Sequence, residues 1–169
     1  MNVTQADAAR VADEQAALRR VATLVANGVP SEELFGVVTA EVGGLLNADL
    51  AGMIRFEPDD MICAVAAWAA VGEHPDVSGR WPLAGDRVAT RILKSRLPTR
   101  EDAWAAVPGP IATVVRGRLG VRSSVGSPIV VESRVWGALF VHSTHAEPLA
   151  ADTEYREVPG DGIPAGATR

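Results

Sequence analysis

A β-hairpin signature in the last third of the chain limits the possible folds more than any other feature. The segment 121–143 reads VRSSVGSPIVVESRVWGALFVHS, two strand-like runs of roughly eight residues that meet at Glu132-Ser133-Arg134. Both faces of the second run are apolar: Val135, Leu139 and Val141 alternate with Trp136, Ala138 and Phe140. A strand of this kind is covered on both sides. The hairpin therefore predicts a sheet with further elements packed against each face.

Two helical patterns precede the sheet. From Asp7 to Asn27, apolar residues return at spacings typical of an amphipathic helix, and Asn27-Gly28 ends it. Its apolar positions are Val11, Leu18, Val21, Leu24 and Val25. A second helix is expected between Pro30 and Asn47, where the apolar stripe consists of Leu34, Val38, Val42, Leu45 and Leu46.

The middle of the chain changes from a helical to an extended period. The segment DLAGMIRFEPDDMICAVAAW predicts two strands joined by a turn at 57–60. The Gly- and Pro-rich segment 72–85 predicts a loop with at most a short strand near Arg80 and Trp81, and short helices are expected at 86–94 and 110–119. This order predicts an α+β domain whose central antiparallel sheet has long helices on one face and short helices on the other.

Charge and composition exclude several function classes. A formal net charge of −5, without a basic stripe, argues against nucleic acid as a partner. The longest apolar run, MICAVAAWAAV, is about half of the roughly 20 residues needed to cross a bilayer, so no membrane span is expected. The single cysteine, Cys63, fits a reducing compartment and a cytoplasmic location. Cys63 is interpreted as a buried small side chain, with a reactive thiol as the alternative.

The last part of this sequence is similar to the end of a GAF domain. The likeness rests on the strand entry Arg122-Ser123, the Gly-x-Pro of 126–128 and the Trp136-Gly137 pair. RWPLAGDRVATRIL and RLPTRED resemble the middle of GAF domains in bacterial sensor histidine kinases. The resemblance implies a GAF-like, PAS-related α+β fold with a central antiparallel sheet and helices on both faces. The expected organisation is an N-terminal helix over 1–28, a GAF-like domain over 29–154 that is incomplete at its C-terminus, and a disordered tail over 155–169.

In one respect the sequence departs from the family it resembles. Members continue after a segment like PLAADTE, at 148–154, into a long amphipathic helix. Here the continuation YREVPGDGIPAGATR contains glycines and prolines that oppose a helix. A truncated or frameshifted gene product is the leading explanation, and a naturally variable terminus is the alternative.

No cofactor, metal or catalytic group is expected. Haem-binding relatives hold the haem through a histidine near the position of Arg118, and relatives that reduce methionine sulfoxide need several cysteines where this chain has Cys63 alone. The cyclic-nucleotide signature of other relatives is also missing. We interpret His142 as a packed histidine rather than a metal ligand. Catalytic motifs are likewise not found, which predicts a non-catalytic protein.

The resemblance implies a small-molecule pocket between the sheet and the short helices. Ser124 and Gly126 are expected to leave space there because they are small. The remaining expected wall residues are Trp68, Trp81, Val88, Ile92, Trp104 and Ile111. These eight positions suit a mostly apolar site with few polar groups, but they suit a filled second core equally well.

Two functions are consistent with these features. The first is a non-catalytic sensor of the two-component type, which binds an unidentified small molecule and signals to a kinase or other output protein. The second is a truncated GAF remnant that acts only as a structural or protein-interaction module. Because Val11, Leu18 and Val25 repeat at sevens, the first helix is also expected to mediate a homodimer.

Overall fold

The computed structural model describes residues 3–76, 78–83 and 87–153. The predicted disordered tail at 155–169 lies outside these residues. The helices are α1 (Val3–Ala26), α2 (Ser31–Leu45), α3 (Arg87–Ser95), α4 (Pro110–Gly117) and the 3-10 turn η1 (Trp104–Ala106). The strands are β1 (Leu50–Glu57), β2 (Met61–Ala69), β3 (Arg80–Pro82), β4 (Thr99–Glu101), β5 (Ser123–Val131) and β6 (Arg134–Ser143).

All six strands form one antiparallel sheet in the order β3-β2-β1-β6-β5-β4. Both predicted hairpins, β1-β2 and β5-β6, are confirmed and occupy its centre. The short edge strand β4 and the turn η1 were not predicted, because three residues are too few to show a hydrophobic period. The α+β fold with a central antiparallel sheet is confirmed.

Each long hairpin turns through two residues with positive φ. In β1-β2 these are Asp59 (62°) and Asp60 (54°), and in β5-β6 they are Glu132 (48°) and Ser133 (64°). Two consecutive left-handed residues form the turn whose twist matches that of the flanking strands. The strand directions around both turns thus follow from local backbone geometry.

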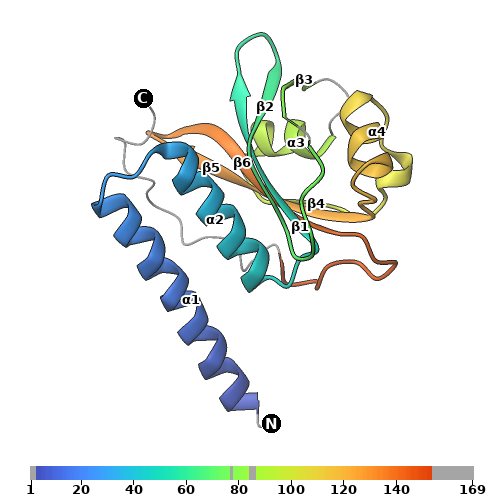
Figure 1. The fold of residues 1–169 in the computed structure, drawn as a ribbon. Helices are drawn as coiled ribbons and strands as arrows, with labels where there is room; N and C mark the ends of the chain where they lie inside the picture. The colour runs from blue at the N-terminus through green and yellow to red at the C-terminus, as the bar shows by residue number, and fades with distance from the viewer. Residues whose placement is uncertain (1–2, 77, 84–86, 154–169) are drawn as a thin grey trace.

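Helices cover both faces of the sheet (Figure 1). We call the face of the sheet that α2 covers the back face, and the opposite face the front face. On the back face, α2 packs over β1, β2 and β6, and Phe35 of α2 clusters with Met53 and Leu139. On the front face, α3 packs over β4, β5 and β6, while α4 lies against β3 and η1. The front core includes the buried residues Val88, Ile92, Trp104, Ile111, Val115 and Phe140. The long first helix, α1, lies outside these layers, contacts α2 and projects beyond the sheet (Figure 1).

A one-residue bulge in each hairpin decides where two tryptophans lie. In β2, Ala66 pairs with Met53 of β1 and Ala64 pairs with Ile54. Val65 is therefore the extra residue of β2. In β6, the register skips Trp136 itself. An extra residue reverses which side chains face which side of a sheet. Trp68 and Trp136 therefore both lie on the back face, so the expected grouping of Trp136 with Ala138 and Phe140 is wrong.

Both tryptophans contact α2. The ring of Trp136 lies 5.1 Å from that of Phe35, between centroids. The ring of Trp68 lies over Gly43, where an added Cβ would come within 2.4 Å of it. The glycine allows α2 to approach the sheet this closely, since any side chain there would displace the indole.

The helix α1 packs on α2 through one buried face. Ala17 is buried, and Arg20 forms a two-pronged ion pair with Glu41 of α2, with N–O distances of 2.5 and 2.6 Å. Val11 and Leu18 are 43% and 52% exposed, so the apolar stripe of the helix is only partly used within this chain. Self-association through these positions stays a prediction. Over the described residues, none of the helices combines the length and apolar character needed to cross a bilayer.

Candidate functional site

A small cavity of about 70 Å³ lies on the front face of the sheet. Its floor is formed by β1, β2 and the end of β6, and its cover by η1 and α4. The covering side chains are Trp104, Ile111, Val115 and Leu119, with Trp81 and His74 at the side. His74 and His142 belong to a lining that is otherwise almost entirely apolar.

The structure brings together some of the eight expected wall residues. Trp81, Trp104 and Ile111 line the cavity. Val88 and Ile92 are fully buried in the front core beside it and belong to the packing around the site. Trp68 does not face the cavity, because the bulge at Val65 turns its side chain to the back of the sheet. Its expected place in the wall is wrong for this reason.

The space expected behind Ser124 and Gly126 is filled. A Cβ built on Gly126 would lie 2.5 Å from Cε1 of Phe140 and 2.8 Å from Cδ1 of Ile92. The small residue therefore accommodates two large neighbours, and the cavity lies instead over β1 and β2. The expectation that Gly126 opens the pocket is corrected accordingly.

Ser124 occupies the centre of a buried hydrogen-bond chain. The indole N–H of Trp104 donates to Ser124 Oγ at 2.6 Å, and Ser124 Oγ lies 2.6 Å from Nδ1 of His142. An indole N–H can only donate, so the serine oxygen accepts from Trp104. Because a hydroxyl has a second acceptor lone pair as well as its proton, the Ser124–His142 bond fits either tautomer of the imidazole. Burial lowers the pKa of His142 from 6.5 to about 3, with His74 as a second cause. His142 is therefore neutral.

His142 lies between its Ser124 partner and the cavity that it helps to line. Ser124, which holds Nδ1, belongs to β5 on one side of β6, whereas the cavity lies over β1 and β2 on the other side. The ring is stacked on Phe140, with centroids 5.9 Å apart and planes 5° apart. The imidazole of His142 is thus a polar group held in place in a cavity lining that is otherwise almost entirely apolar.

Sequence reasoning described His142 correctly as packed but missed its role in the cavity. This role could have been found from the strand register of the β5-β6 hairpin. With the turn at 132–133 and one bulged residue, Ser124 pairs with His142. A serine facing a histidine on a buried sheet surface indicates a hydrogen-bonded pair.

We expect the stability of the domain to fall as pH drops from 6.5 to about 5. In the unfolded chain, His142 is protonated below pH 6.5, whereas in the folded protein it stays neutral down to about pH 3. Because the unfolded state binds the additional proton, acid favours unfolding between these two pKa values. The free energy of unfolding should fall by about 1–2 kcal/mol, measured by urea denaturation. His142→Phe should flatten this dependence, and an equal slope in the variant would contradict the buried neutral histidine.

A wider groove of about 600 Å³ adjoins the cavity. It runs between Ala64–Ala69 of β2 and the following loop, which brings Glu73, His74 and Asp76 to it. Ala64, Ala66, Ala67 and His74 line both spaces. His74, whose Nδ1 donates to the carbonyl of Pro75 at 2.7 Å, therefore lies at the boundary between the apolar cavity and the polar groove.

Among the residues the structure describes, no three His, Cys, Asp or Glu side chains come together in a way that could hold a metal ion. Cys63 is half-buried on β2, with its Sγ 3.6 Å from the carbonyl of Ala64.

The fold and the cavity together define a class of protein: an α+β domain in which short helices close a small apolar space over an antiparallel sheet. The family model of the GAF domain matches residues 30–157. The chain belongs to the GAF domain family, whose members are typically regulatory modules that bind small molecules.

Solved GAF domains have the same fold. The phycocyanobilin-bound GAF domain of a cyanobacterial phytochrome is 22% identical, with a TM-score of 0.65 over 82% of this chain and 84% of that one. The GAF domain of an Acinetobacter phosphoenolpyruvate-protein phosphotransferase is 15% identical, with a TM-score of 0.61 over 92% and 86%. Comparison with curated proteins yields no match. At these identities the likeness establishes the fold.

Proposed function

We propose that this protein is a non-catalytic GAF sensor that binds a small molecule in the cavity over β1 and β2. The observation that carries the proposal is the buried imidazole of His142 in the cavity lining. With the Ser124 hydroxyl donating to Nδ1, its Nε2–H is a single donor in an apolar space. A buried donor without a partner costs about 1–3 kcal/mol, so a molecule that accepts this hydrogen bond is stabilised there. A packed core has no need of such a group, whereas a binding site uses it to orient its ligand.

The dimensions of the site define the ligand class. A cavity of about 150 Å³ takes up benzene, so one of about 70 Å³ suits a molecule, or part of one, with a few non-hydrogen atoms. That part should be apolar and carry one acceptor, such as a carbonyl oxygen. A larger ligand would extend past His74 into the groove, where Glu73 and Asp76 offer polar contacts.

The rival function is a structural or protein-interaction module that binds nothing small. It is favoured by one observation, the filled space around Gly126 between Phe140 and Ile92. In either function the proposed partner is a kinase or another output protein of a cytoplasmic two-component system. A homodimer through the exposed positions Val11 and Leu18 of α1 would bring two such domains together.

A matched pair of probes tests the sensor proposal. Butanone and 2-methylbut-1-ene differ only by C=O in place of C=CH2, and their binding can be followed by NMR shifts of Trp81 and Trp104. The ketone-to-alkene affinity ratio should fall about 2- to 12-fold in His142→Phe, which keeps a flat ring but removes the donor. In the unaltered protein, butanone should also shift the ¹⁵N signal of His142 Nε2, a readout that does not depend on folding of the variant.

The outcomes separate the two functions. Cavity signals that stay unchanged with either probe at millimolar concentration would contradict the sensor and support the interaction module. Binding with an unchanged affinity ratio and no Nε2 shift would contradict the role of His142.

A further inference from the structure

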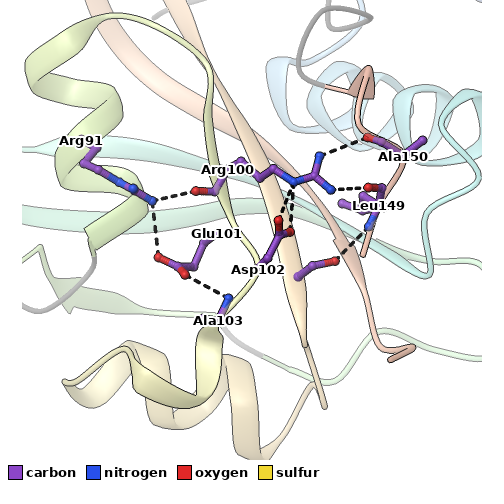
Figure 2. Close-up of polar contacts among 8 residues, drawn as sticks. Arg91, Arg100, Glu101, Asp102, Ala103, Leu149 and Ala150 are labelled. Carbon is purple, nitrogen blue, oxygen red and sulfur yellow. Dashed lines mark hydrogen bonds and ion pairs between the residues drawn. The ribbon is translucent and has the colours of Figure 1, made fainter. Parts of the chain in front are cut away.

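Arg100 of β4 holds the segment by which the chain leaves the sheet. Figure 2 shows its guanidinium between three groups: Nη1 donates to the carbonyl of Ala150 at 3.1 Å, Nη2 donates to the carbonyl of Leu149, and Nε donates to Asp102 at 2.8 and 3.0 Å. The two carbonyls are about fifty residues away in sequence. A planar guanidinium engaged at several of its donors is held in one orientation.

The exit segment is also anchored by its own residues. The backbone N–H of Leu149 donates to the buried Ser123 Oγ at 3.2 Å, and the Leu149 side chain packs in the back core with Val125 and Val141. Thr153 is 3% exposed, and its N–H donates to the carbonyl of Ala150 at 3.0 Å. The Ala150 carbonyl thus joins Arg100 to the turn that ends at Thr153.

On its other side, β4 is joined to α3 and to the residue before η1, which covers the cavity. Arg91 of α3 donates to the carbonyl of Arg100 at 2.8 Å and lies 3.4 Å from the Glu101 carboxylate (Figure 2). The second oxygen of that carboxylate accepts the N–H of Ala103 at 3.0 Å, directly before Trp104 of the cavity wall. Polar contacts therefore run without interruption from the cavity wall to the exit segment.

The edge strand β4 can transmit a displacement along this path. It has three residues, paired with Ser124–Gly126 of β5, and Trp104 also bonds to Ser124 in that same stretch. A strand this short is held as much by its side-chain contacts as by its backbone hydrogen bonds to β5. A shift of Trp104 that moved the Ala103 amide would act on the Glu101 carboxylate, and through Arg91 on the carbonyl of Arg100.

We propose that Arg100 couples the cavity wall at Trp104 to the exit segment Leu149–Thr153, so that a change at the cavity alters how firmly this segment is held. The coupling extends the proposed sensing function, because it supplies a route from the site to whatever receives the signal. It can be tested without a ligand, by perturbing Trp104 directly. A failure here would therefore leave the binding proposal untouched, and a failure of binding would leave the coupling untouched.

The test is amide hydrogen exchange at Leu149 and Thr153 in a double-mutant cycle. Trp104→Phe removes the bond to Ser124 but keeps an aromatic ring, and Arg100→Lys keeps the charge but cannot reach both carbonyls and Asp102 together. We expect Trp104→Phe to speed exchange at these amides about 5-fold or more when Arg100 is present, a typical size for coupling between sites. In the Arg100→Lys background, Trp104→Phe should change the exchange rate less than 2-fold. A 2-fold change corresponds to about 0.4 kcal/mol, the margin within which the effects of independent substitutions add.

A matched arginine provides the control. Arg96 donates to the carbonyl of Ser133 at 2.6 Å, at the hairpin turn and away from the exit segment. Arg96→Lys should leave the response to Trp104→Phe unchanged. If Trp104→Phe changes exchange at Leu149 and Thr153 equally with and without the Arg100→Lys substitution, Arg100 anchors the segment without coupling it, and the proposal is wrong.

Discussion

Truncation of Leu139 to alanine should lower the free energy of unfolding by about 2–5 kcal/mol, the usual cost of a large-to-small change in a core. Leu139 is 1% exposed on the central strand β6, where it is paired with Met53 of β1 on one side and Ser127 of β5 on the other. Its side chain packs with Phe35 of α2 in the back core. The loss leaves a cavity between two rigid layers, which cannot close around it.

Urea denaturation of Leu139→Ala and Leu97→Ala provides the measurement. Leu97 is 63% exposed, so its truncation should change the stability by less than about 0.5 kcal/mol. Similar losses in the two variants would show that α2 does not pack on β6 as described.

Gly137→Ala should also destabilise the domain strongly, for the opposite reason. An added Cβ would lie 2.2 Å from the carbonyl oxygen of Ile54 and 3.3 Å from Cα of Arg55, both backbone atoms of the paired strand β1. Backbone cannot turn aside as a side chain can, so β1 and β6 would have to separate beside the bulge. We expect a loss at or above the upper end of the roughly 1–3 kcal/mol found for overpacked cores.

The matched control for Gly137→Ala is Gly52→Ala on β1. A Cβ at Gly52 would meet nothing closer than the carbonyl oxygen of Ala66 at 3.8 Å, so the change should be tolerated. Thermal melts of the two variants should therefore separate clearly. A Gly137→Ala protein as stable as Gly52→Ala would mean that the two strands are not held this closely.

The hairpins and helices could be predicted because their signals are local. Apolar periodicity defined the helices and long strands, and the turn at 57–60 was recognisable from its residues. The three-residue strands β3 and β4 carry little such signal. The first was expected only as a short strand near Trp81, and the second was missed, although Arg100 within it makes the longest-range polar contacts of the exit segment.

The candidate site could be predicted only in part, because its position depends on two bulges. Alternation counted from Ile62 would turn Trp68 toward the front, but the extra residue Val65 turns it to the back. The same effect at Trp136 makes it a partner of Phe35. A bulge is selected by how the strands pack against the layers above and below them, and those contacts are distant in sequence.

The fold class, the family and the central hairpins could be recognised from the order of residues alone, because periodicity and turn residues act over neighbouring positions. Which residues share the cavity depends instead on contacts between distant parts of the chain. The space beside Gly126 is filled by Phe140 and Ile92, and Trp104 reaches His142 through Ser124, from three separate segments. Such packing and hydrogen bonding require one particular strand register, and a one-residue shift reverses every side chain that follows it.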